Sequence, residues 1–179
     1  MHPARFNGVY SLNLIMSFIL KNYSLSTPSL STNISMTTPT ALPPALEKIV
    51  QRFARVSDPK RKYEQLIHYA KKVEVMPETD KIDRNKVLGC VSQVFITAAL
   101  DDGTVAFTGD ADAVLVKGLV GLLLEGMNGL TPQEIVALAP DFIKDTGLDV
   151  SLTPSRANGF YNIFKLMQQK ASELDAQVA

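Results

Sequence analysis

The chain has 179 residues, a length that suits one domain of ordinary size and is too short for two large ones. Its 18 basic and 18 acidic residues balance to a formal net charge of zero, so we expect no nucleic-acid partner that binds by counterion release. Hydrophobic residues make up 46% of the chain, which indicates a globular protein with a sizeable core. The single cysteine, Cys90, excludes an intramolecular disulfide and any zinc or cluster site built from several thiolates of this chain.

The beginning of the chain differs in composition from the rest. The first acidic residue is Glu47, and the stretch before it is rich in Ser and Thr. We expect residues 1–40 to form a disordered leader and residues 41–179 to form the working domain. The apolar run 12–20 is shorter than the ~20 residues of a membrane span, so no membrane insertion is expected. Three interpretations of the leader stay open: an organelle transit peptide, a signal peptide, or translation from a start codon upstream of Met36.

Two helices are predicted in the first part of the domain. Pro43 and Pro44 open the first, because proline is tolerated in the first turn, and helically spaced apolar residues follow. Asp58 is a capping residue for the second helix, which runs to about Val73. The polar segment 76–86 is expected to be a long surface loop.

A β-hairpin is predicted in the middle of the chain. Residues 91–100 and 104–108 are rich in β-branched and apolar residues, and an Asp-Asp-Gly turn sequence separates them. We expect Gly109 and Asp110 to end the second strand and to cap the next helix. Asp112 would then lie in the first turn of that helix, where a negative charge suits the helix dipole.

The remainder of the chain predicts helices. Residues 113–124 are nearly all apolar and indicate a buried core helix, and Thr131 begins a capping box for another. A short helical turn is expected at 141–145, and a last helix from near Pro154 to about Leu174. Because like elements occur in runs, we predict an α+β fold, a small antiparallel sheet with helices packed mainly on one face.

Cys90 is the first candidate for chemistry. Gly89 lets the backbone turn sharply and leaves the thiol uncrowded. Arg84 and Lys86 are near in sequence and are expected to favour the thiolate. The alternative is that this lone cysteine is a small buried hydrophobic residue without a chemical role.

Three other positions stand out, each with two interpretations. Arg156 falls near the third position of the last predicted helix, where the dipole disfavours a cation, so it is either functional or a solvated surface residue. Lys117 interrupts an apolar helix, so it is either functional or a lysine whose aliphatic stem lies along the surface while its charged end reaches water. His68 is expected at the surface, and a Cys–His hydrolase built from Cys90 and His68 is the alternative function.

Five sequence motifs stand in order along the predicted domain, at residues 89–94, 109–113, 116–119, 130–135 and 152–156. Together they resemble the motifs of the SufE family, the sulfur acceptors of iron–sulfur cluster assembly. The resemblance extends from about Leu42 to the C-terminus. It implies the α+β fold that SufE shares with the cluster scaffold IscU, although this chain lacks the extra cysteines that a scaffold needs.

The resemblance also implies a function. Cys90 would accept persulfide sulfur from a cysteine desulfurase of the SufS type, and the sulfur would then pass to a SufBCD-type assembly complex. The protein would be a carrier and activator rather than an enzyme, with no cofactor or metal of its own, because pyridoxal phosphate belongs to the desulfurase. Docking of the partner or support of the Cys90 loop is expected from Gly89, Ser92, Gln93, Asp110, Asp112, Lys117, Gly118 and Arg156.

Partner, compartment and oligomeric state are less closely specified. The CsdE-type proteins, which serve a different desulfurase, are not separated from SufE by this sequence. We expect a monomer or weak dimer in the cytoplasm, or in the plastid stroma if residues 1–40 are a transit peptide. We further hypothesise that the Cys90 loop is partly buried at rest and swings out when the desulfurase binds, which shields a persulfide from reductants and from oxidation.

Overall fold

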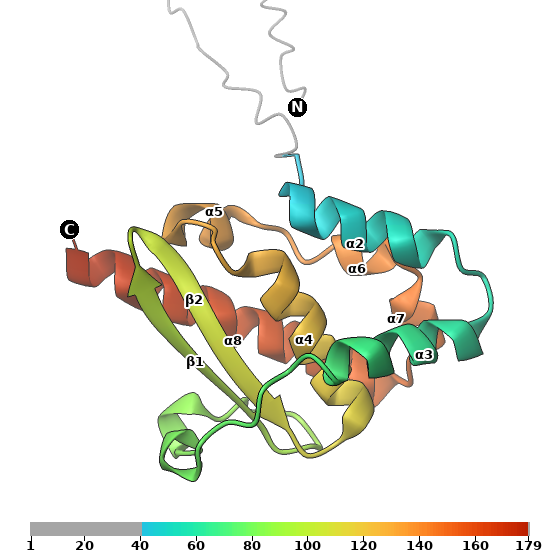
Figure 1. The fold of residues 1–179 in the computed structure, drawn as a ribbon, viewed down its shortest axis with the longest axis horizontal. Helices are drawn as coiled ribbons and strands as arrows, with labels where there is room; N and C mark the ends of the chain where they lie inside the picture. The colour runs from blue at the N-terminus through green and yellow to red at the C-terminus, as the bar shows by residue number, and fades with distance from the viewer. Residues whose placement is uncertain (1–40, 179) are drawn as a thin grey trace, which may run out of the picture. The chain divides into compact units, whose positions relative to one another are not determined.

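The structure of the protein is a computed structural model that describes residues 41–178, so the predicted leader lies outside the described residues. Two helices come first, then two 3-10 turns, a hairpin and five further helices (Figure 1). In chain order these elements are α2 (Pro44–Ala54), α3 (Pro59–Ala70), η1 (Glu78–Asp80), η2 (Asp83–Asn85), β1 (Val94–Asp101), β2 (Thr104–Ala111), α4 (Val114–Met127), α5 (Pro132–Ala137), α6 (Phe142–Asp145), α7 (Leu148–Ser151) and α8 (Pro154–Val178).

The helix starts follow the local signals in the sequence. The Asp58 side chain accepts a hydrogen bond from the Lys60 N–H at 2.9 Å, which caps α3. Thr131 and Glu134 form the complete capping box of α5. Gly147 adopts a left-handed conformation, with φ of 63°, between α6 and α7. The predicted helix caps at Asp58 and Thr131 are confirmed.

The antiparallel hairpin is confirmed, but its predicted bounds are wrong at two points. Strand β1 begins at Val94 rather than at residue 91, and β2 continues through Gly109 and Asp110 to Ala111. Asp110 therefore does not cap α4, and Asp112 precedes that helix instead of lying in its first turn. The reason is that Asp110 pairs with Phe95 in the antiparallel register, and its carboxylate is paired with lysine side chains instead of a helix N-terminus, as described below.

One face of the hairpin packs against the helices. Along β2, Val105 and Phe107 are buried, whereas Ala106 and Thr108 are exposed. Helix α4 contacts β2, α2, α3 and α8 and so forms the centre of the core. The structure is therefore an α+β fold, a small antiparallel sheet with helices packed on it, as predicted (Figure 1).

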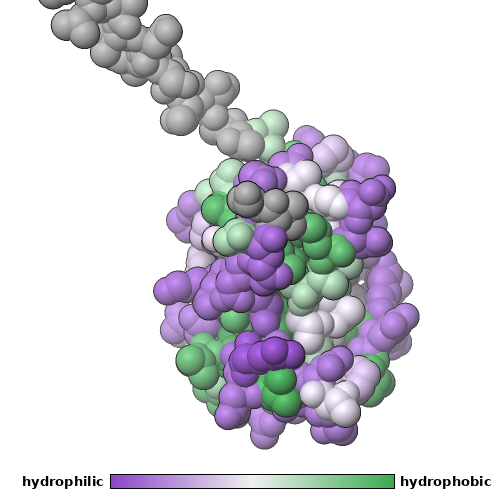
Figure 2. All heavy atoms as spheres, turned by 90° about the vertical axis from the view of Figure 1, so that its left-hand side faces the viewer, coloured by the Kyte–Doolittle hydropathy of each residue, from purple (hydrophilic) through white to green (hydrophobic). Residues whose placement is uncertain are grey.

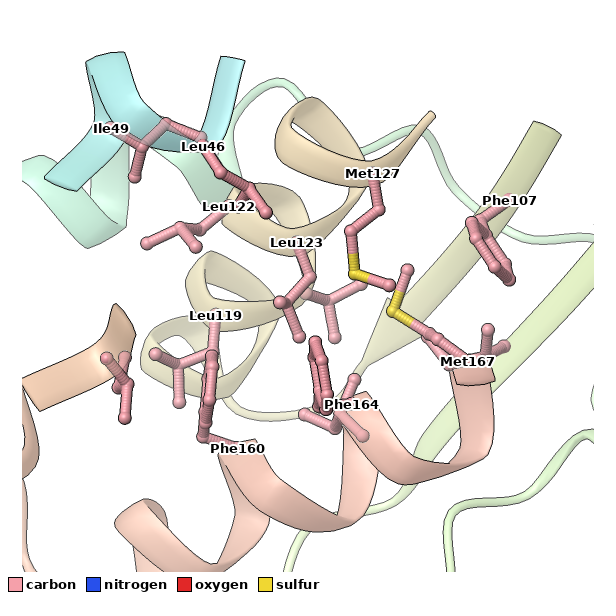
Figure 3. Packing of buried hydrophobic residues seen from close by; sticks show 14 of the residues in the cluster. Leu46, Ile49, Phe107, Leu119, Leu122, Leu123, Met127, Phe160, Phe164 and Met167 are labelled. Atoms are coloured by element: carbon pink, nitrogen blue, oxygen red, sulfur yellow. The ribbon is translucent and has the colours of Figure 1, made fainter. Parts of the chain in front are cut away.

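The core around α4 consists of large apolar side chains from several elements (Figure 3). Burying each of them contributes about 1.5–3 kcal/mol. Hydrophilic residues cover most of the face that Figure 2 shows, with smaller hydrophobic areas between them. The labelled core residues in Figure 3 are Leu46, Ile49, Phe107, Leu119, Leu122, Leu123, Met127, Phe160, Phe164 and Met167.

Helices α3 and α4 cross at glycines. A Cβ atom at Gly118 would clash with the backbone carbonyl of Leu66, and one at Gly121 would lie 2.7 Å from the carbonyl oxygen of Tyr69. Backbone atoms cannot yield as a flexible side chain does, so larger residues would force the helices apart. The interruption of the apolar run at Gly118 is thus explained by the close approach of α3.

Candidate functional site

Cys90 lies on the loop that precedes β1, and helix α8 holds this loop at two points. The half-buried thiol is 3.8 Å from the carbonyl oxygen of Gly159, within reach of a weak S–H···O hydrogen bond. The Asn162 side chain donates an N–H to the carbonyl oxygen of Gly89 at 3.1 Å. Gly89 has a φ of 74°, so the loop turns in the left-handed region that favours glycine.

Both ends of the loop are also fixed. At its start, the Val87 N–H donates to the Val94 carbonyl oxygen at 2.9 Å. At its end, the Gln93 N–H donates to the Asp112 carboxylate at 3.1 Å, and the Asp112 N–H donates to the Gln93 carbonyl at 3.2 Å. The segment 88–92 therefore lies between two anchors, and two of the predicted site residues form the second one.

The neighbours of Cys90 in the loop include two strongly exposed hydrophobic residues. Leu88 is 79% exposed and Val91 is 91% exposed, whereas the thiol between them is turned toward α8. Exposed apolar side chains are common singly, but here they flank the one cysteine of the chain. This arrangement suits a surface that another protein covers.

The thiol faces a pocket of about 210 Å³. The N-terminal part of α8 supplies Ser155, Arg156 and Gly159 to its wall, and the loop supplies Ser92. Arg156 occupies the third position of α8, in agreement with its predicted place in the helix. The structure therefore brings Arg156 and Ser92 together with Cys90.

Burial raises the pKa of the Cys90 thiol, and a hydrogen bond from Asn162 only partly offsets that effect. The expectation that nearby cations favour the thiolate is therefore wrong for the resting loop. Arg84 and Lys86 line a different groove, on the side of Gly89, instead of the pocket that the thiol faces. Burial therefore favours the protonated thiol over the thiolate in the resting loop.

Asp110 is the centre of a second polar cluster, close to the end of the loop. Its buried carboxylate lies 2.8 Å from the Lys117 ammonium and 3.4 Å from that of Lys81. Burial by itself raises the pKa of this carboxyl, but hydrogen bonds from Lys117 and the Ala111 N–H, with the Lys117 charge, hold it below its usual value. Lys117 is thus ion-paired. The cluster ties the segment before the loop to β2 and α4.

Two predicted residues lie apart from this site. His68 is exposed on α3, and the residues around the Cys90 thiol in the described part of the chain do not include it. Gly118 is buried where α3 crosses α4. The contacts of Cys90 therefore give a hydrolase built on Cys90 and His68 no support.

Sequence reasoning missed Asn162, Gly159 and Lys81. Asn162 and Gly159 are far from Cys90 in sequence, and no local motif links them to it. Gly159 carried one usable signal, because a glycine within a helix often marks a close approach. A Cβ there would lie 3.7 Å from the Cys90 sulfur.

Metal-binding side chains are scattered over the described part of the chain. Among residues 41–178, no group of three or more of them gathers in one place. None of the helices described there has the length and apolar character needed to cross a membrane.

Fold and site together define a class of protein: an α+β domain with one cysteine on a loop that is anchored at both ends and sheltered by a helix. Residues 47–171 match the sequence profile of the SufE family, described as an Fe-S metabolism associated domain. The chain therefore belongs to the SufE family and has a role in iron–sulfur metabolism.

Relatives share this assignment. An uncharacterized SufE-like protein of Synechocystis is 69% identical over 130 residues, which cover 73% of this chain and 82% of that protein. The SufE-like protein 1, chloroplastic/mitochondrial, of Arabidopsis thaliana is 46% identical over 76% of this chain and 37% of its own length. The cysteine desulfuration protein SufE of Plasmodium falciparum is 38% identical over 68% of this chain and 51% of its own length.

The fold has a solved counterpart. The solution structure of a hypothetical protein from Thermus thermophilus aligns with a TM-score of 0.66 at 26% identity. The alignment covers 75% of this chain and 98% of that protein. The chain thus spans nearly all of that structure and most of the Synechocystis relative, but only about half or less of the Arabidopsis and Plasmodium relatives.

Proposed function

We propose that this protein takes persulfide sulfur from a cysteine desulfurase onto Cys90 and passes it to an assembly complex of the SufBCD type. Membership of the SufE family and the name of the Plasmodium relative support this proposal. The observation that carries it is the placement of Cys90 on an anchored loop, with the thiol turned inward and its hydrophobic neighbours Leu88 and Val91 turned out.

The chemistry needs one nucleophilic sulfur on this chain. The Cys90 thiolate attacks the outer sulfur of the persulfide on the desulfurase, and a new S–S bond forms as the old one breaks. The desulfurase cysteine leaves as a thiolate, so the step involves no net oxidation or reduction. Pyridoxal phosphate acts earlier, on the desulfurase, when sulfur is released from free cysteine.

Docking of the desulfurase opens the loop. At rest, burial keeps the Cys90 thiol protonated, which protects it from unwanted reactions. Leu88 and Val91 offer the desulfurase an apolar contact before the loop moves. Their docking draws segment 88–92 outward, breaks the contacts with α8 and lets the thiol ionise.

The polar motif residues have supporting roles in this account. Asp112 and Gln93 fix the end of the loop, and the Asp110–Lys117 pair supports the strand beside it. Arg156 lines the pocket next to the thiol, where its charge suits an acidic group of a docked partner.

Location and assembly remain predictions. The Arabidopsis relative is named as chloroplastic/mitochondrial, which supports a plastid location with residues 1–40 as a transit peptide. A cytoplasmic location, the boundary at residue 41 and a monomeric or weakly dimeric state remain predictions as well.

A turnover assay tests the proposal. A SufS-type desulfurase is supplied with free cysteine and a reductant, and sulfide release is followed with and without this protein. Wild type and the control His68→Ala are expected to stimulate release equally, and Cys90→Ser is expected not to stimulate it. Full stimulation by Cys90→Ser would contradict the proposal, and loss of stimulation with His68→Ala would contradict the expectation that sulfur acceptance does not need His68.

A further inference from the structure

A basic groove lies beside the Cys90 loop, apart from the pocket that the thiol faces. It has a volume of about 520 Å³, and its cations are Arg84, Lys86 and Lys165. Asp83 is the one acidic residue in its lining, and Leu88 and Leu166 supply apolar surface. The lining therefore carries an excess of two positive charges in a chain whose net charge is zero.

The cations of the groove are not neutralised within residues 41–178. The ion pairs described there are Lys72–Glu125, Lys81–Glu78, Lys81–Asp110, Lys117–Asp110 and Lys144–Asp141. Arg84, Lys86 and Lys165 are absent from them. A fourth cation adjoins the groove, because the Lys170 ammonium donates to the Arg84 carbonyl oxygen at 3.3 Å.

The groove is continuous with the sulfur site along one face of α8. Gly159 contacts the thiol, Asn162 bonds the loop at Gly89, and Lys165 and Gln169 line the groove. These helix positions recur every three or four residues, so they lie on the same side of the helix. Gly89, the residue before the cysteine, is itself part of the groove wall.

We propose that this basic groove binds an acidic segment of the cysteine desulfurase and so directs the sulfur-bearing cysteine of that enzyme to Cys90. The proposal rests on the proposed function and names the chemistry of the partner surface. Unpaired cations attract carboxylates and speed the encounter, and they penalise partners without matching charge. Leu88 and Leu166 add room for an apolar side chain of the same segment.

Charge reversal tests the groove. The double variant Lys86→Glu/Lys165→Glu is compared with wild type for binding to the desulfurase by biolayer interferometry at low and physiological salt. We expect at least about tenfold weaker binding, mainly through slower association, and loss of most of the salt dependence. Lys86→Arg/Lys165→Arg is expected to bind as wild type does.

Two controls separate the groove from other causes. Lys48→Glu/Arg55→Glu makes the same change in net charge outside the groove, at an exposed residue of α2 and at the exposed residue that follows this helix. This variant is expected to bind the desulfurase as wild type does. Circular dichroism and thermal unfolding establish that each variant folds. Binding that weakens equally in the groove and control variants would overturn the proposal, as would wild-type affinity in the groove variant.

Sulfur loading of Cys90 distinguishes this inference from the proposed function. At saturating desulfurase, the groove variant is expected to reach the wild-type level of sulfur loading. The desulfurase concentration that gives half-maximal loading is expected to be higher than for wild type. If the groove variant binds the desulfurase and loads sulfur as wild type does, the proposed role of the groove is wrong, and Cys90 as the sulfur acceptor is unaffected. Wild type that neither binds the desulfurase nor takes up sulfur would overturn both.

Discussion

Asn162 of α8 donates a side-chain N–H to the carbonyl oxygen of Gly89 at 3.1 Å and thereby holds the loop that carries Cys90 against the helix. The thiol itself lies 3.8 Å from the carbonyl oxygen of Gly159, one helical turn earlier. In the proposed opening of the loop both contacts would break, so they are expected to set how readily the sulfur becomes accessible. A net hydrogen bond contributes about 1 kcal/mol, which a docking partner can offset.

Replacing Asn162 should therefore expose the thiol. Asn162→Ala is expected to speed amide hydrogen exchange in segment 88–92 about fivefold, the factor that corresponds to one lost hydrogen bond, and this readout does not depend on the pKa of the thiol. The matched control is Asn158→Ala, an exposed asparagine on the same helix. Equal rates for wild type and Asn162→Ala would show that this contact does not restrain the loop.

The raised pKa of Cys90 predicts how its reactivity depends on pH. Because burial disfavours the thiolate, the native protein should be alkylated slowly at neutral pH, and the rate should rise with pH through a midpoint above that of the urea-unfolded chain. Alkylation rates in both states give the two midpoints. A native midpoint at or below the unfolded one would contradict the buried resting state.

Asp110 should contribute stability that acid removes. Its pKa is lowered in the folded protein, so the contribution is complete above the unfolded pKa and is lost as pH falls through the folded pKa. Asp110→Asn is expected to lower the free energy of unfolding by about 2 kcal/mol at neutral pH, with a smaller difference in acid.

Urea unfolding at neutral and acid pH measures this effect. The control is Asp141→Asn, which removes an exposed partner of Lys144 and should change stability little. If Asp110→Asn is as stable as wild type at neutral pH, the cluster with Lys117 does not support the fold.

Gly118 is expected to be required for packing. Gly118→Ala would drive a Cβ into the Leu66 carbonyl group, and we expect a loss of about 3 kcal/mol in thermal or urea unfolding. Gly159→Ala is the matched control, because its Cβ would meet only the Cys90 sulfur, at an ordinary 3.7 Å. If the two variants are equally stable, the close packing of α3 against α4 does not require a glycine at position 118.

Local signals predicted most of the fold. Asp58 and Thr131 cap helices through contacts within their own turns, so the sequence alone locates them. The end of β2 was missed because Gly109 resembles a strand breaker. In the structure it allows close packing, since a Cβ there would lie 2.7 Å from an Ile96 methyl and 2.8 Å from a Val120 methyl.

The sequence predicted only those site residues that lie in the same segment of chain as Cys90. Cys90 and Gly89 stand together in the sequence, so the loop was identified. Asn162 was not, because its contact with the loop arises only when α8 packs beside it. The direction of the Cys90 pKa was likewise missed, since burial is set by tertiary structure, and the cations that are near in sequence line a different groove from the one that the thiol faces.

Intact mass spectrometry tests the central claim most directly. The protein is mixed with a SufS-type desulfurase and free cysteine, and the mass is measured before and after reduction, with Cys90→Ser as the control. We predict one or more added sulfur atoms on wild type, located at Cys90 by peptide mapping and removed by the reductant, and none on Cys90→Ser. Wild type that gains no sulfur while the desulfurase turns over, or Cys90→Ser that gains as much, would contradict the assignment of Cys90 as the sulfur acceptor.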